Sequence, residues 1–350
     1  MLARHDLALF LTVALCCLGV SCTRDSTGGN VPAGAVQLQG AGATFPAPLY
    51  KKWREEYAKQ RPGTKLNYDA VGSGEGTKRF LAGAVDFGAS DAALKDEDMA
   101  SIQQGAQLVP VTAGSIVLAY NLDGLGGDLK LKRDVYVDIF QSKISRWDDP
   151  RIQESNPGLH FPSEEIVRVV RLDSSGTTFA FTNHLSAISE DWRDRGPGVG
   201  STVKWPGNVM QVNGNDGVAG RIKISKNSIG YVEYGFAART GLQMAWLENK
   251  EGQFIRPHGG SGLATLINAE MPENLRIFFP DPSGKESYPI VTYSWLLLYK
   301  KYDDPKKAAA LKEYVNWCLT VGQEYSESLG YLRLPPHIVT LTASALDNIS

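Results

Sequence analysis

The chain has 350 residues, of which 43% are apolar and 21% are charged, and its formal net charge is −2. This length exceeds what one hydrophobic core usually supports, so we expect about two domains of a globular protein. The small net charge excludes a broad basic surface for nucleic acid or for an acidic membrane. Any selectivity for an anion must therefore come from local groups.

The N-terminus has the features of a targeting segment. An apolar run from Leu7 to Val20 is too short to span a bilayer, so residues 1–21 are predicted to be a signal peptide. Residues 22–35 are rich in Gly, Ser, Thr and Asn and are expected to form a flexible tether. Cys22 follows Ser21 in a sequence that resembles the lipobox of bacterial lipoproteins. We expect a lipid anchor at Cys22, and the alternative is a conventional cleavage that releases the protein.

Three of the four cysteines lie in or just after the apolar run, which leaves Cys318 apart from them. If Cys22 is acylated, Cys318 has no partner for a structural disulfide. Cys318 ends a predicted helix at residues 305–318, and we expect it to be a buried apolar filler there.

Strands and helices alternate after the tether. A strand at residues 36–40 is followed by an amphipathic helix for which Thr44 is the expected cap, with Pro46 in the first turn. A strand at residues 66–71 leads through a glycine-rich turn to another helix, and a third strand covers residues 85–90. This alternation predicts α/β architecture with a mostly parallel sheet.

Polar residues follow each of these strands. Thr44, Ser73 and Asp91 all fall at predicted carboxyl ends, which is where parallel sheets place their ligands. We therefore expect these three residues to lie close together.

Two buried strands, at residues 115–121 and 289–299, enclose enough chain for a second domain. The simplest arrangement is a first lobe interrupted by a second, with the chain crossing between them in these strands. Lobe I would then comprise residues 36–117 and 289–350, and lobe II residues 118–288.

The segment from Arg171 to Thr178 places a guanidinium, a carboxylate and a turn rich in hydroxyl groups within eight residues. Arg171 offers a rigid fork of donors to an oxyanion. Ser175, Gly176 and Thr177 offer hydroxyls and backbone N–H groups at a helix N-terminus, where the dipole favours negative charge. Alone, this segment also fits an ordinary helix cap beside a surface arginine.

The hydroxyl-bearing helix starts at Thr44, Ser73 and Ser175 could together enclose one oxyanion. A hydrogen bond to a charged group contributes about 1.5–3 kcal/mol, so several of them with Arg171 can offset the desolvation of the ion. Asp173 is expected to orient Arg171 rather than to contact the ion.

Asp91 discriminates between possible ions. A carboxylate can accept the proton that phosphate keeps near neutral pH, whereas it would face a bare oxygen of sulfate. Asp91 therefore predicts selectivity for phosphate. The alternative from spacing alone is a helix cap or an Asx-turn.

Catalytic motifs are missing from the sequence. The five histidines show no metal-ligand spacing, the turn at residues 72–78 lacks the spacing of a phosphate-binding P-loop, and no G-x-S-x-G elbow is present. We therefore expect neither catalytic residues nor a metal or cofactor.

Seven motifs follow one another along the chain: Gly40 to Pro48, Gly72 to Gly74, Val85 to Asp91, Arg171 to Thr177, Gly214 to Gly217, Ile229 to Tyr234 and Gly330 to Pro335. In order and content they resemble the PstS family, the phosphate-binding proteins of bacterial high-affinity phosphate ABC importers. The resemblance implies a type II periplasmic-binding-protein fold, with two α/β lobes joined by two crossover hinge strands and a ligand cleft between them.

The resemblance also implies which residues bind phosphate. Phe45 would act through its backbone N–H, and the full set would be Thr44, Phe45, Ser73, Asp91, Arg171, Ser175, Gly176 and Thr177, with Asp173 orienting Arg171. The motif from Gly214 to Gly217 is expected to be a structural turn that opens a helix. The family often has Gly where this chain has Ser174, so the turn must accommodate a Cβ at that position.

The implied function is that of a monomeric receptor in the periplasm or on the outer face of a bacterial membrane, which delivers phosphate to an ABC permease. A receptor for sulfate or molybdate is the first alternative, and Arg171 and Asp91 together argue against it. A secreted phosphate-ester hydrolase and a surface phosphate sensor or adhesin are further alternatives.

Overall fold

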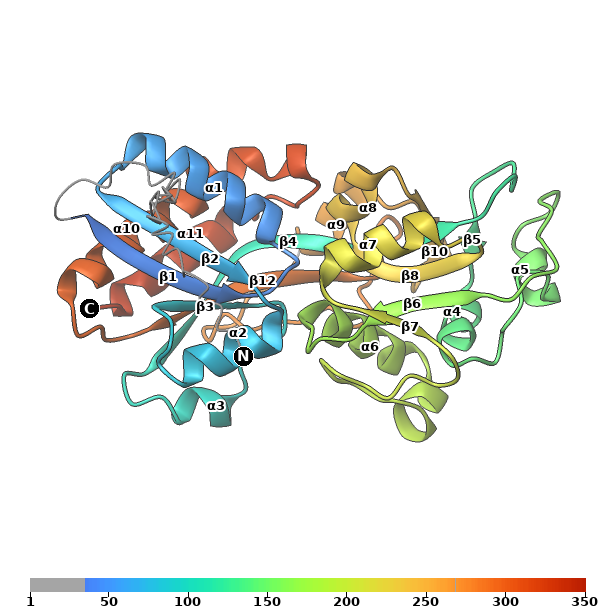
Figure 1. Ribbon diagram of the computed structural model, residues 1–350, viewed down its shortest axis with the longest axis horizontal. Helices are drawn as coiled ribbons and strands as arrows, with labels where there is room; N and C mark the ends of the chain where they lie inside the picture. Colours follow the sequence, from blue (N-terminus) through green and yellow to red (C-terminus); the bar gives the residue numbers. More distant parts are fainter. Residues whose placement is uncertain (1–34, 268) are drawn as a thin grey trace, which may run out of the picture. The chain divides into compact units, whose positions relative to one another are not determined.

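The computed structural model describes residues 35–267 and 269–350 (Figure 1). The predicted signal peptide, Cys22 and residues 22–34 of the predicted tether lie outside the described residues. No helix within the described ranges is long and apolar enough to cross a membrane.

Nine strands form one sheet, and three short strands form another. The order in the large sheet is β2-β1-β3-β12-β4-β8-β6-β7, with β9 also paired to β4, and the small sheet has the order β11-β10-β5. The strands are β1 Val36–Gly42, β2 Thr64–Ala70, β3 Phe87–Ser90, β4 Ala106–Asn121, β5 Lys130–Leu131, β6 Val167–Arg171, β7 Met210–Val212, β8 Ser228–Glu233, β9 Gln243–Met244, β10 Trp246–Glu248, β11 Phe254–Ile255 and β12 Val291–Tyr299.

The helices alternate with these strands. They are α1 Ala47–Gln60, α2 Ser73–Leu81, α3 Asp96–Ala100, α4 Arg133–Phe140, α5 Pro150–Glu154, α6 Gly176–Ile188, α7 Gly214–Ile224, α8 Tyr234–Thr240, α9 Gly259–Leu266, α10 Pro305–Leu319 and α11 Pro336–Ala345. Helix α1 packs on β2, α10 packs on β1, and α2 packs on β3 and β1. Helix α6 packs on β8, and α7 packs on both β8 and β6 (Figure 1).

Strand β4 is shared by two halves of the large sheet. Its residues Ala106 to Ser115 pair with β12, and its residues Ile116 to Asn121 pair with β8. We call the half with β1, β2, β3 and β12 lobe I, and the half with β6, β7 and β8 lobe II. Within lobe I, β1 is parallel to β2 and β3, and within lobe II, β6 is parallel to β7 and β8.

The α/β architecture is therefore as predicted. The prediction of a mostly parallel sheet was wrong, because β12 is antiparallel to β3 and β4, and β4 is antiparallel to β8 and β9. Parallel pairing is confined to the outer strands of each lobe, where a helix connects successive strands. The strand predicted at residues 115–121 is longer than expected, because it extends back to Ala106 along β12. The second strand predicted to cross between the lobes begins at the junction, where Val291 pairs with Ser115. The residue limits of the two lobes stay predictions.

The aromatic face predicted for the first helix lies in the core of lobe I. Tyr50, Trp53 and Tyr57 of α1 are buried, and the ring of Tyr57 packs edge-on against Trp317 of α10. Cys318 on α10 is free and fully buried, as expected for an apolar filler.

The cap predicted for this helix was wrong. Helix α1 begins at Ala47, with Pro46 in the cap position, and no side chain caps it. Thr44 contributes only its carbonyl oxygen, which accepts from the N–H of Ala47 at 3.2 Å. The Thr44 hydroxyl cannot serve as the cap because backbone and side-chain N–H groups of Asn215 in lobe II already donate to it.

Candidate functional site

The three strand ends of lobe I bring their polar residues to one edge of the sheet. Thr44 follows β1, Ser73 is the first residue of α2 after β2, and Asp91 follows β3. All three residues are buried, and the N–H of Asp91 donates to Oγ of Ser73 at 3.2 Å. Because β1 lies between β2 and β3, the parallel register delivers all three to the same place.

Lobe II contributes a strand end and a helix start. Arg171 is the last residue of β6, and α6 begins at Gly176 with Ser175 as its cap. Oγ of Ser175 accepts from the N–H of Thr178 at 3.1 Å. The N–H groups of Gly176 and Thr177 belong to the first turn, where an α-helix offers them no internal acceptor. This helix start can therefore donate to an anion.

Arg171 is buried beside its expected partner. Its Nε donates to Oδ1 of Asp173 at 2.7 Å, and its Nη2 donates to Oδ2 of the same carboxylate. Although burial opposes it, this pairing holds the pKa of Asp173 below its ordinary value. The remaining nitrogen, Nη1 of Arg171, is buried and has no hydrogen-bond partner among the described residues. A buried donor without an acceptor is costly, so an anion that contacts Nη1 would remove that cost.

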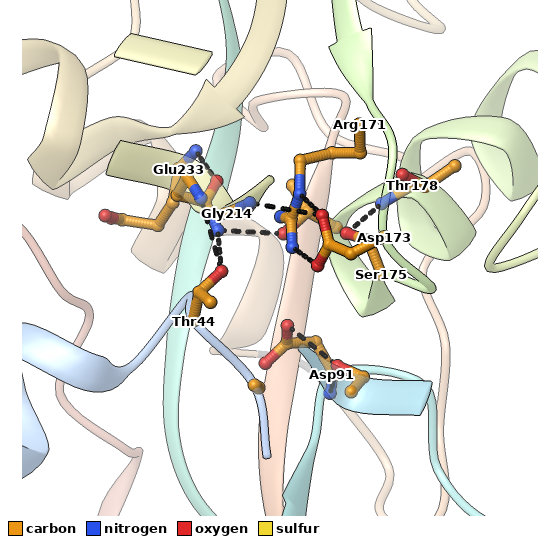
Figure 2. A network of polar contacts seen from close by, with 12 residues as sticks. Thr44, Asp91, Arg171, Asp173, Ser175, Thr178, Gly214 and Glu233 are labelled. Atoms are coloured by element: carbon orange, nitrogen blue, oxygen red, sulfur yellow. Dashed lines mark hydrogen bonds and ion pairs between the residues drawn. The ribbon is translucent and has the colours of Figure 1, made fainter. Parts of the chain in front are cut away.

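Figure 2 shows the side chains of Thr44, Asp91 and Arg171 gathered in one region. Thr44 and Asp91 come from lobe I, and Arg171 comes from lobe II. The structure thus brings Arg171 together with two residues that lie 80 and 127 positions before it in the sequence, Asp91 and Thr44. The arrangement offers several donors and a single carboxylate acceptor to whatever lies between them.

Glycines allow the two lobes to touch beside these residues. The N–H of Gly74 donates to the carbonyl oxygen of Ser174 in the other lobe at 3.0 Å. A Cβ placed on Gly176 would lie 2.6 Å from both Cβ of Asp91 and Oγ of Ser73, which is closer than real Cβ contacts come. Only a residue without a side chain fits there.

The Cβ of Ser174 is accommodated by another glycine. A side chain on Gly74 would lie 2.1 Å from Oγ of Ser174, so the serine side chain occupies space that Gly74 leaves open. The φ angle of Ser174 is also not positive, so a residue with a Cβ adopts this backbone without strain.

Each carboxylate oxygen of Asp91 contacts the hydroxyl group of a serine. Oγ of Ser294 donates to Oδ1 at 2.7 Å, and Oγ of Ser73 lies 3.4 Å from Oδ2. Burial raises the pKa of Asp91 to about 7, and Ser294, Arg171 and Ser73 each oppose that rise. No backbone N–H of the described residues donates to this carboxylate, so the alternative of a helix cap or Asx-turn was wrong.

Phe45 is the site candidate whose side chain points elsewhere. Its ring is fully buried and packs against Tyr331, whose hydroxyl donates to the carbonyl oxygen of Phe45 at 2.6 Å. Any contact with a ligand must therefore come from its backbone, as the sequence resemblance implied.

The sequence did not single out Asn215 or Glu233. The motif from Gly214 to Gly217 does open helix α7, as expected, but Asn215 also donates to Oγ1 of Thr44 and of Thr177. Glu233 caps α8 by accepting from two backbone N–H groups. Burial raises the pKa of Glu233 to about 8, and Asp91 adds to that rise. In the sequence, these two residues were indicated only by the motifs that contain them, Gly214 to Gly217 and Ile229 to Tyr234.

Among the described residues, no group of three His, Cys, Asp or Glu side chains could hold a metal ion.

Comparisons with known proteins show which family this chain resembles. Residues 28–321 match the model of the PBP superfamily domain. The chain is 39% identical over 308 residues to the phosphate-binding protein PstS of Pasteurella multocida, which covers 87% of this chain and 88% of that protein. It is 39% identical over 322 residues to the PstS of Haemophilus influenzae, with 90% and 94% of the two chains covered.

Solved structures share the fold at lower identity. A phosphate-binding protein from Stenotrophomonas maltophilia matches with a TM-score of 0.73 at 20% identity, over 89% of this chain and 94% of that one. A high-affinity periplasmic phosphate-binding protein, PfluDING, solved with bound phosphate, matches with a TM-score of 0.75 at 19% identity, over 88% and 93%. The fold is therefore the two-lobe periplasmic-binding-protein fold.

Proposed function

This chain belongs to the PstS family of phosphate-binding proteins, and we propose on that premise that it captures inorganic phosphate between its lobes and delivers it to an ABC permease. The observation that carries the proposal is Nη1 of Arg171, a buried donor without a partner among the described residues. In Figure 2, Arg171 lies in the same region as Thr44 and Asp91 of lobe I and Ser175 of lobe II. A tetrahedral oxyanion would supply acceptors for all of these donors at once.

The phosphate contacts that we propose divide between the lobes. Lobe I supplies Thr44, the backbone N–H of Phe45, Ser73 and Asp91. Lobe II supplies Arg171, Ser175, Gly176 and Thr177. Asp173 holds the guanidinium of Arg171 through two hydrogen bonds, which leaves Nη1 as the donor that we assign to the ion.

Asp91 gives this site its preference for phosphate over sulfate. Sulfate carries no proton at neutral pH, so its oxygen and the Asp91 carboxylate would be two acceptors in contact within a buried site. Phosphate can donate its proton to Asp91 and thereby satisfy both groups. This acceptor is also the feature that disfavours a receptor for sulfate or molybdate.

Outside the described residues, we propose that the signal peptide is removed and that Cys22 is lipidated. The receptor would then be held at the outer face of a bacterial membrane as a monomer, with the tether giving it reach toward the permease.

Calorimetric titration of the purified mature chain with phosphate and with sulfate tests the function. We expect saturable binding of one phosphate per chain, and sulfate binding at least about 100-fold weaker, because two opposed acceptors leave a buried group unsatisfied. Absence of phosphate binding would refute the proposed function, and equal affinity for the two ions would refute the role of Asp91. Steady release of phosphate from a model ester, lost on replacement of Ser73 or Ser175, would instead favour the hydrolase.

A further inference from the structure

Asn215 connects the two lobes at the candidate site. It is the second residue of α7 in lobe II and is fully buried. Its Nδ2 donates to Oγ1 of Thr44 in lobe I at 3.1 Å and to Oγ1 of Thr177 in lobe II at 3.2 Å. Its backbone N–H also donates to Oγ1 of Thr44, at 3.2 Å. One side chain therefore contacts two of the hydroxyl groups that the sequence assigned to phosphate.

The orientation of the Asn215 amide follows from a third contact. The backbone N–H of Glu233 donates to Oδ1 of Asn215 at 3.0 Å. A backbone N–H can only donate, so the atom that it meets must be the carbonyl oxygen of the amide. The NH₂ group must then face the two threonines, and each of its two protons has one acceptor.

This orientation determines what the threonine hydroxyls can do. A hydroxyl has two lone pairs and one proton. Oγ1 of Thr44 accepts two hydrogen bonds from Asn215, so both lone pairs are used and its proton remains to be donated. Oγ1 of Thr177 accepts from Nδ2 of Asn215. Neither hydroxyl has an acceptor within the described part of the chain.

The first two N–H groups of α7 are not available to an ion. The N–H of Gly214 donates to Oδ1 of Asp173 at 3.1 Å, and the N–H of Asn215 donates to Thr44. In Figure 2, Gly214 lies between Thr44 and the Arg171–Asp173 pair, and its dashed contact leads to Asp173. These two N–H groups are therefore occupied by acceptors that belong to the protein.

We propose that Asn215 is a positioning residue that makes the hydroxyl of Thr44 an obligate donor to the bound phosphate and turns the proton of the Thr177 hydroxyl toward the same ion. This inference rests on the proposed function, because the acceptor of both protons is the phosphate ion. Since its bonds to Thr44 join the two lobes, Asn215 also favours the arrangement in which the lobes meet around the ligand.

Two substitutions separate this role from simple packing. Asn215→Asp keeps the shape but replaces the two donors by acceptors, so the threonine protons turn toward the aspartate and away from phosphate. We expect phosphate affinity to fall by about 100-fold or more, since two hydrogen bonds to a charged group are lost and a charge is added. Asn215→Leu removes the polar contacts without reversing them, and we expect a loss of about tenfold.

A double-mutant cycle with Thr44→Val tests whether Asn215 acts through that hydroxyl. If it does, Asn215→Leu should weaken phosphate binding much less in the Thr44→Val protein than in the parent protein. Thermal unfolding without phosphate shows whether each variant is folded. Asn213→Ala is the matched control, because Asn213 is exposed, precedes the same helix and caps nothing, so its phosphate affinity should equal that of the parent.

The outcomes distinguish the two proposals. If the parent protein does not bind phosphate, the proposed function fails. If the parent binds but the losses from Asn215→Leu and Thr44→Val simply multiply, or if Asn215→Asp binds as tightly as the parent, the positioning role of Asn215 fails.

Discussion

Ser294 on β12 donates its hydroxyl proton to Oδ1 of Asp91 over 2.7 Å. Two residues earlier on the same strand, the hydroxyl of Thr292 lies 3.4 Å from the backbone carbonyl oxygen of Asp91. A strand from the C-terminal part of the chain therefore holds both the carboxylate and the backbone of a residue at the end of β3. The carboxylate is kept in one orientation, with Oδ2 toward Ser73.

Removing this hydroxyl should change ion selectivity. In Ser294→Ala, the carboxylate loses a donor that favours its charged form, so the pKa of Asp91 should rise further above about 7. More of Asp91 is then protonated at neutral pH and can donate to sulfate. We expect the ratio of phosphate to sulfate affinity at pH 7 to fall several-fold, measured by titration calorimetry.

Thr292→Val is the matched control for this change. Thr292 is buried on the same strand, but its hydroxyl contacts only carbonyl oxygens. Its affinity ratio should match that of the parent. An unchanged ratio in Ser294→Ala would mean that the serine serves only the packing of β12.

Asp91→Asn should relax the rejection of sulfate more directly. The amide offers an N–H donor where the carboxylate offers only acceptors, so sulfate no longer meets an unsatisfiable contact. We expect the ratio of phosphate to sulfate affinity to fall by at least about tenfold, which corresponds to about one hydrogen bond. Competition between the two ions on the variant measures this, and a preserved preference for phosphate would assign selectivity elsewhere.

The same variant has a consequence for stability without ligand. The pKa of Asp91 is raised in the folded protein, so the folded state holds this proton more tightly than the unfolded state does. Its contribution to stability is complete below the ordinary pKa of an aspartate and is lost as the pH rises to about 7. The fall in Tm between pH 5 and pH 8 should therefore be smaller in Asp91→Asn. Some fall should persist because Glu233 has a raised pKa as well.

Arg171→Lys should weaken phosphate binding while keeping the charge. Lysine cannot bond both oxygens of Asp173 and also present a further N–H to the ion, because it lacks the planar fork. We expect a loss of about 10- to 100-fold in affinity. Arg168→Lys serves as the control, because Arg168 is a buried arginine on the same strand that donates only to protein groups, among them the carbonyl oxygens of Pro206 and Asn208. That variant should lose stability but bind phosphate normally.

Gly176→Ala should hold the lobes apart. The added methyl would press on Asp91 and Ser73 of the opposite lobe, and overpacking of this kind costs about 1–3 kcal/mol. Phosphate affinity should fall about tenfold or more, with little change in Tm of the free protein. Gly220→Ala in α7 is the control, since nothing lies within 4 Å of a Cβ there. Equal affinities of the two variants would contradict the contact between the lobes.

Cys22→Ser tests membrane attachment, which concerns residues outside the described ranges. Without the thiol no lipid can be added, so the protein should move from the membrane fraction to the extract obtained without detergent. Immunoblotting of the two fractions measures this change. An unaltered distribution would contradict a lipid anchor at this residue.

The fold was predictable because its signals are local. Short strands followed by polar turns and helices predict parallel pairing, and parallel pairing places Thr44, Ser73 and Asp91 at one edge. These predictions require only the period of the sequence and a general rule of sheet geometry. The buried aromatic face of α1 was predictable for the same reason, because the spacing of its aromatic residues is a local pattern.

The contacts between distant segments were not predictable in this way. Thr44 looks like a helix cap from its neighbours, but Asn215, which lies 171 residues away, occupies its hydroxyl. Ser294 lies in a strand whose sequence predicts a fully buried core strand. No neighbouring residue indicates that its side chain contacts a carboxylate 203 residues away. Such roles depend on the register of β12 against β3 and on the meeting of the lobes.

The sharing of β4 between the two halves of the sheet also bears on unfolding. One end of this strand completes lobe I through β12, and the other end completes lobe II through β8. If either lobe unfolded, β4 would lose the hydrogen bonds to that lobe's neighbouring strand. The other lobe would then keep β4 as a strand that is paired along only part of its length. We therefore expect scanning calorimetry to record a single cooperative transition for the two lobes, not two successive ones.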